Sequence, residues 1–118
     1  MFTIIRKLRT KHEIIVKEWY DNLHQQITYV LSNSQYYLIS LTVDYNHMGN
    51  AIVVVCSKNS GTVYRFIDDR GDIYIERKFG ENGWGLFKCA PREIHEHPTQ
   101  NPYSLLITTI TEFVQIVE

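Results

Sequence analysis

Four apolar runs separated by glycine-containing polar turns dominate the middle of this chain and limit what it can fold into. The runs lie at about residues 36–44, 51–57, 62–68 and 73–79. Connections this short join antiparallel neighbours, because a parallel crossover needs a dozen or more residues. The layout therefore predicts an antiparallel sheet of four or five strands, the fifth a short one at about 86–89.

Amphipathic helices are predicted on both sides of the strand region. Between about 11 and 31, apolar residues recur every three to four positions, which matches the period of a helix. The segment at about 102–117 shows the same spacing, and Asn101 before Pro102 is typical of a helix start. β-Branched residues at 107–111 lower its helix propensity, so a closing strand is the competing interpretation.

Length and composition fit a single α+β domain over residues 1–118 with a core of its own. The hydrophobic fraction is 44%, and a chain of this size buries about two-thirds of its unfolded surface. The apolar run before Arg6 is too short for a secretory signal, and no stretch approaches the about 20 apolar residues of a membrane span. We therefore expect a cytoplasmic protein without membrane contact, in which Cys56 is a buried free thiol rather than half of a disulfide with Cys89.

The charge balance argues against a nucleic-acid partner. Twelve basic and thirteen acidic residues leave a formal net charge of -1, which gives no global attraction for phosphates. A basic stretch near the start nevertheless leaves a phosphate-contacting arm as a third hypothesis. Its residues are Arg6, Lys7, Arg9 and Lys11.

No complete catalytic, cofactor or metal motif is present. Glu93, His95 and His97 alternate, so an extended backbone would point all three to one side, and these residue types bind metals. A solvated polar loop between two prolines is the commoner meaning of such a string. The glycine-rich stretch 80–85 lacks the Lys-Ser/Thr ending of a phosphate-binding loop. We predict no catalytic residue, no metal and no cofactor.

Acidic and aromatic residues around the later hairpin form the candidate binding surface. Tyrosine and tryptophan make large contacts at low entropic cost, and clustered carboxylates speed the approach of a basic partner. Solvated turn chemistry is the alternative explanation for the acids, and a helix over Tyr64 and Phe66 would remove their aromatic rings from the surface. The candidate partner-binding residues are Asp68, Asp69, Asp72, Tyr74, Glu76, Glu81 and Trp84. A second acidic face would consist of Glu93, Glu96 and Glu112.

This chain is small, and its predicted antiparallel sheet is flanked by helices. It has an acidic aromatic surface, and it lacks catalytic and export motifs. It resembles bacterial immunity proteins of toxin and immunity pairs, including those of contact-dependent growth inhibition. The resemblance covers the whole chain as a layout and rests on no shared motif. It implies a non-catalytic inhibitor, an antitoxin in the cytoplasm, whose partner is a cognate protein toxin domain, often a nuclease.

An alternative from a different class is a small ligand-binding or enzymatic domain. Its pocket would lie between the N-terminal helix and the sheet, lined by Trp19, Tyr37 and a histidine. A histidine in hydrogen-bond contact with a carboxylate inside a deep pocket would favour this alternative. A filled interior would count against it.

Overall fold

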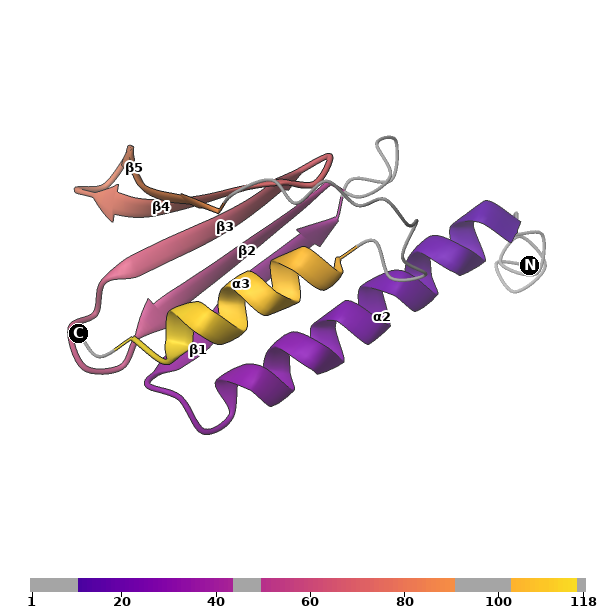
Figure 1. The fold of residues 1–118 in the computed structure, drawn as a ribbon, viewed down its shortest axis with the longest axis horizontal. Coiled ribbons are helices and arrows are strands. Elements are labelled where there is room, and N and C mark those ends of the chain that lie inside the picture. The colour runs from indigo at the N-terminus through magenta and orange to yellow at the C-terminus, as the bar shows by residue number, and fades with distance from the viewer. Residues whose placement is uncertain (1–10, 44–49, 91–102, 117–118) are drawn as a thin grey trace, which may run out of the picture.

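The computed structural model describes residues 11–43, 50–90 and 103–116, and it has the predicted α+β architecture (Figure 1). One antiparallel sheet is accompanied by two helices, and the fifth strand is present. In chain order the elements are α2 (Lys11–Leu31), β1 (Tyr36–Val43), β2 (Ala51–Ser57), β3 (Val63–Asp69), β4 (Asp72–Phe79), β5 (Gly83–Ala90) and α3 (Ser104–Val114).

The sheet is a meander in which each strand pairs with the next, in the order β1-β2-β3-β4-β5. Both helices lie on one side of it (Figure 1): α2 packs along β1, and α3 lies beside α2 and over β3 and β4. We call the helix-covered side the inner face and the opposite side the outer face. Neither described helix combines the length and the apolar character needed to cross a membrane.

The core lies between the inner face and the two helices. Side chains alternate between the two faces of a strand, so every second residue of the central strands points inward. The most deeply buried of these are Val53, Val55, Phe66, Ile73 and Ile75, at 0–2% exposure. The apolar stripes of the helices meet them through Leu23 and Ile27 of α2 and Leu106 and Ile110 of α3.

A β-bulge in β1 reverses part of the predicted side-chain pattern. Strict alternation assigns one side of the strand to Tyr37, Ile39, Leu41 and Val43. The pairing with β2 shifts between Leu38 and Ser40, which adds one residue to β1. Because one extra residue turns the earlier part of a strand over, Tyr36 becomes part of the core at 2% exposure, whereas Tyr37 and Ile39 are 48% and 51% exposed.

The interpretation of β2 as a strand covered on both faces is wrong. Its run from Ala51 to Cys56 is apolar at every position, which is typical of doubly covered strands. In the structure Ile52 points to the outer face and is 38% exposed, and its neighbour Val54 is half-buried. The outer side of β2 is therefore exposed at Ile52 and becomes buried toward Cys56, which is 7% exposed.

Helix α3 is shorter than predicted, but it is a helix and not a closing strand. It begins at Ser104, and Tyr103 occupies the N-cap position without a side-chain cap hydrogen bond. The proposed cap, Asn101 with Pro102, lies outside the described residues. Three threonine hydroxyls donate to the carbonyl four residues earlier, at 2.7–2.9 Å, and so find partners within the helix. They belong to Thr108, Thr109 and Thr111.

A tight two-residue turn joins β3 to β4. Asp69 pairs with Asp72, and the residues between them, Arg70 and Gly71, have φ angles of 55° and 92°. Positive φ at both positions is the type I′ arrangement, which suits the twist of a hairpin and favours Asn-Gly. Arg70 is strained here, because an arginine side chain disfavours the left-handed region.

We expect Arg70→Asn to raise the free energy of unfolding by about 0.5–1 kcal/mol, because asparagine adopts positive φ more readily. The backbone N–H of Arg70 donates to Oδ1 of Asn50 at 2.9 Å, and this bond is unaffected by the substitution. Urea denaturation of the two proteins measures the difference. Arg70→Ala is the matched control, since it removes the same charge without easing the backbone. Equal stability of the two variants would contradict this explanation.

Candidate binding surfaces

The seven predicted binding residues do not form one compact cluster. Asp69 and Asp72 lie at the β3–β4 turn, and Glu81 lies at the β4–β5 turn. These two turns are at opposite ends of β4, whose eight residues span about 25 Å. Asp68 is only 2% exposed. The remaining three residues, Tyr74, Glu76 and Trp84, share the outer face.

An arginine at the centre of the outer face holds two of the predicted residues in place. Nε of Arg65 donates to Oε1 of Glu76 at 2.5 Å, and the guanidinium carbon lies 4.2 Å from the ring centroid of Trp84. The strand register places Arg65 directly opposite Glu76. Their side chains are 29% and 21% exposed. An ion pair shielded in this way is screened less than a free surface pair, so this trio, the Arg65 cluster, is a preorganised centre.

An apolar band crosses the outer face beside the Arg65 cluster. Ile52, Ile67 and Tyr74 lie directly opposite one another on three neighbouring strands. Tyr74 is 37% exposed, and Leu86, which pairs with Glu76, is 64% exposed. Both helices lie on the inner side, so neither of them covers the band (Figure 1). Contiguous apolar surface of this kind marks interaction sites in soluble proteins.

Carboxylates stand at both ends of this outer surface. Asp69 is exposed at the β3–β4 turn, and Glu81 is exposed at the β4–β5 turn. Within the Arg65 cluster, by contrast, the charge of Glu76 is balanced by Arg65. The β3–β4 turn also carries Asp72 and the exposed Arg70, and the exposed Lys78 lies near the other end. The outer face therefore combines an apolar band and a neutral centre with a net negative charge at the β3–β4 turn, an arrangement that favours a basic contact at that end.

Asp68 belongs to the interior and not to the binding surface. Its Oδ1 accepts a hydrogen bond from the N–H of Gly71 at 2.9 Å, which closes the β3–β4 turn. Burial raises the pKa of Asp68, the Gly71 hydrogen bond lowers it, and the charges of Asp69 and Asp72 add to the increase, which together give a pKa of about 6. Burial and the Asp68 charge also raise the pKa of Tyr103. We assign Asp68 a structural role.

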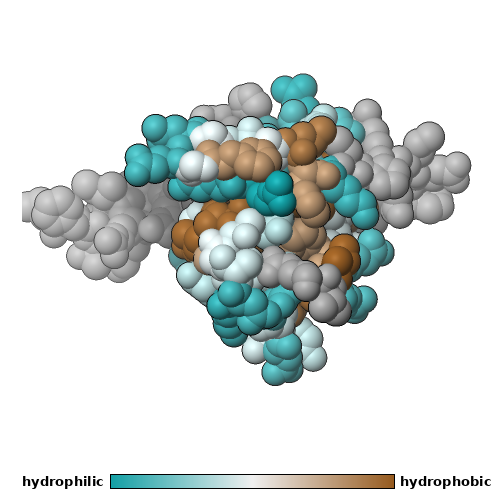
Figure 2. Space-filling model, turned by 90° about the vertical axis from the view of Figure 1, so that its left-hand side faces the viewer, coloured by the Kyte–Doolittle hydropathy of each residue, from teal (hydrophilic) through white to brown (hydrophobic). Residues whose placement is uncertain are grey.

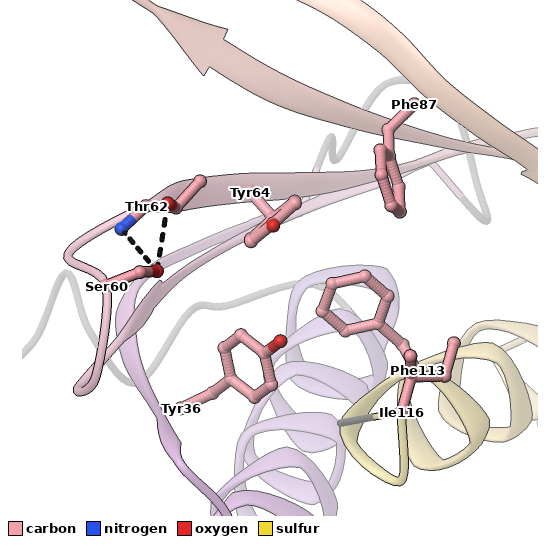
Figure 3. Close-up of a pocket in the computed structure, with 7 residues that line it drawn as sticks. All are labelled: Tyr36, Ser60, Thr62, Tyr64, Phe87, Phe113 and Ile116. Atoms are coloured by element: carbon pink, nitrogen blue, oxygen red, sulfur yellow. Dashed lines mark hydrogen bonds between the residues drawn. The ribbon is translucent and has the colours of Figure 1, made fainter. Parts of the chain in front are cut away.

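A pocket of about 340 Å³ opens on the inner side, at the C-terminal end of α3 (Figure 3). It was not anticipated from the sequence. Its walls come from β1, the β2–β3 turn, β3, β5 and the end of α3, and they consist of Tyr36, Ser60, Thr62, Tyr64, Phe87, Phe113 and Ile116. None of these seven residues is a histidine, a cysteine or a carboxylic acid, and most of the lining is apolar, which favours apolar groups.

This pocket differs in place and lining from the predicted pocket between the N-terminal helix and the sheet. Trp19 is half-buried against the core, and Tyr37 is exposed on the outer side of β1. Neither residue lines the pocket. His24 stacks on Tyr20 along α2, with ring centroids 6.2 Å apart, and its side chain is exposed.

Several candidates lie outside the described residues. These are Arg6, Lys7 and Arg9 of the basic stretch, and Glu93, His95, Glu96 and His97 of the loop after β5. Within residues 11–43, 50–90 and 103–116, no group of three His, Cys, Asp or Glu side chains could hold a metal ion. The expectation for Cys56 is confirmed, since it is a buried free thiol.

Comparison of this chain with protein-family models, with curated proteins and with solved structures gave no match.

We predict that Asp68→Asn flattens the pH dependence of stability between about pH 4 and 6. The folded pKa of about 6 lies above the ordinary value of 3.8. Folded protein therefore binds the proton more tightly, and wild-type stability falls as pH rises through this window. A pKa difference of this size corresponds to about 3 kcal/mol. Allowing for screening near the turn, we expect the variant to be more stable at pH 7 by about 1–2 kcal/mol.

Asparagine preserves the acceptor for the Gly71 N–H, so the turn stays closed. Urea denaturation at half-unit steps from pH 3.5 to 7.5 measures the effect. Asp69→Asn is the control, because it removes a neighbouring carboxylate that is exposed. The assignment of the proton to Asp68 is wrong if the Asp68 variant keeps the wild-type slope of stability against pH. It is also wrong if the Asp69 variant loses that slope.

Proposed function

We propose that this chain is a non-catalytic protein-binding inhibitor, an immunity protein that neutralises a cognate toxin domain through the outer face of its sheet. The observation that carries the proposal is the uncovered apolar band, Ile52, Ile67 and Tyr74, beside the preorganised Arg65 cluster. Interfaces owe most of their affinity to a few ordered aromatic and arginine side chains surrounded by apolar contacts. The outer face provides such a set without any rearrangement of the backbone.

The size of the outer face is compatible with a specific protein complex. Five strands spaced about 4.8 Å apart and about 25 Å long give a flat area of about 600 Å². Stable complexes bury about 800 Å² on each partner. Projecting side chains and the two flanking turns add the remaining area. A partner would therefore have to span the sheet from the β3–β4 turn to the β4–β5 turn.

The charge at the β3–β4 turn indicates the chemistry of the partner. Asp69 and Asp72 outnumber Arg70 there, and this net negative charge would attract a basic surface and raise the association rate. Enzymes that cleave nucleic acids present such basic surfaces, because they contact phosphates. A nuclease toxin domain in the cytoplasm is therefore the partner that we propose.

The test is capture of the partner on immobilised protein, followed by measurement of binding and inhibition with purified components. We expect Tyr74→Ala to weaken binding about 10- to 100-fold through a faster dissociation rate. We expect the pair Asp69→Lys and Glu81→Lys to slow association and to reduce its dependence on salt. The nuclease activity of the captured partner should fall to background at a one-to-one ratio with the wild-type chain.

Two charge reversals on the helix layer are the matched controls. Glu18 of α2 and Glu112 of α3 are exposed on the side opposite the outer face. Glu18→Lys and Glu112→Lys change the net charge as the test variants do, and both should leave affinity unchanged. A larger loss of affinity with Glu112→Lys than with Tyr74→Ala would place the interface on the helix layer instead of the outer face. A captured partner that keeps full activity would rule out an inhibitor.

A further inference from the structure

Four aromatic rings from three strands and a helix surround the pocket at the end of α3. The ring centroid of Phe113 lies 5.0 Å from that of Tyr64 and 5.2 Å from that of Tyr36, and Phe87 lies 5.6 Å from Tyr64. Figure 3 shows these side chains turned toward a common space. Edge-to-face and tilted contacts of this kind are favourable and hold the rings in place. The apolar wall is therefore fixed before any ligand arrives.

The pocket has the size and access of a small-molecule site. Its volume of about 340 Å³ lies at the lower end of the range for ligand pockets, about 300–1,000 Å³. Phe87 and Ile116 are 48% and 52% exposed at its mouth. Figure 2 faces this end of the molecule, where hydrophobic groups lie in a hollow between hydrophilic borders. Covering these groups with an apolar ligand would be favourable.

The two hydroxyl side chains of the β2–β3 turn at the edge of the pocket, Ser60 and Thr62, are engaged with each other. Oγ of Ser60 donates to Oγ1 of Thr62 at 2.9 Å and accepts from the Thr62 N–H at 3.2 Å. These contacts belong to the β2–β3 turn and keep the hydroxyls at one border of the site. The body of a ligand would therefore meet mainly aromatic and aliphatic carbon.

A guanidinium group stands beside the pocket. Arg77 pairs with Tyr64 across β3 and β4, so the two side chains share the inner face. Its guanidinium carbon lies 6.0 Å from the ring centroid of Phe87 and 4.9 Å from that of Phe79. The ion pairs seen between described residues are Lys17 with Asp21 and Arg65 with Glu76, and neither of them involves Arg77. Arg77 is thus a positive charge near the mouth without a described carboxylate bound to it.

We infer that this pocket binds an amphipathic monocarboxylate, a compound with one carboxylate and an apolar chain or ring. The apolar part lies among the rings of Tyr36, Tyr64, Phe87 and Phe113, and the carboxylate lies at Arg77, whose planar fork matches its two oxygens. Aromatic cages that select organic cations work through the faces of the rings alone. Here the fixed positive charge and the lack of acidic lining residues favour the anion.

The test compares octanoate, 1-octanol and octylammonium, which share one apolar chain and differ in charge. Titration calorimetry and amide chemical-shift changes with the full chain measure binding and its location. We expect octanoate to bind about tenfold more tightly than 1-octanol, and octylammonium to bind more weakly than both. Arg77→Gln should reduce octanoate affinity to that of 1-octanol, whereas Phe87→Ala should weaken both ligands.

Lys78→Gln is the matched control, because Lys78 is exposed and pairs with Trp84 on the outer face. It removes one positive charge from the same strand and should leave octanoate affinity unchanged. The inference would be overturned by equal affinity for octanoate and octylammonium, or by an unchanged octanoate affinity of the Arg77→Gln variant. Amide chemical-shift changes confined to residues away from the pocket would overturn it as well. Because the toxin-binding surface is on the opposite face, Tyr74→Ala should not alter octanoate binding, so the two proposals fail independently.

Discussion

The packing of Phe113 against the sheet determines where α3 lies, and both candidate surfaces follow from that placement. This side chain is 5% exposed, and its ring contacts Tyr36 of β1, Phe66 of β3 and Phe87 of β5 at centroid distances of 5.2, 5.1 and 6.2 Å. A buried phenylalanine with such contacts typically contributes about 3–5 kcal/mol to stability. The same ring fixes the helix and forms one wall of the pocket.

The two described helices both lie on one face of the five-stranded sheet and cover only part of it (Figure 1). Helix α2 packs along β1 and α3 over β3 and β4, so β5 extends beyond the helix layer on the inner side. The pocket opens at this overhang, where Phe87 of β5 meets the end of α3. The outer face keeps its apolar band because both described helices lie on the inner side (Figure 1).

Local patterns predicted the elements well, and non-local packing explains what they missed. The bounds of α2 agree with the predicted 11–31, and the first four strands agree within one residue, because periodicity and turn chemistry act over short segments. The β1 bulge depends on pairing with β2, so alternation alone could not reveal it. The burial of Asp68 could have been inferred, since it alternates in phase with Tyr64 and Phe66. The pocket could not, because its residues come from five separate segments.

The alternation of β4 explains why the two surfaces differ in charge. Glu76 and Arg77 are adjacent in the chain, so they point to opposite faces. On the outer face Glu76 neutralises Arg65, so the charged side chains at the two turns set the potential. On the inner face Arg77 lies over aromatic rings, which stabilise a cation without cancelling its charge. One strand thus places a neutralised ion pair on the outer face and a cation beside the pocket, the difference on which the two proposals depend.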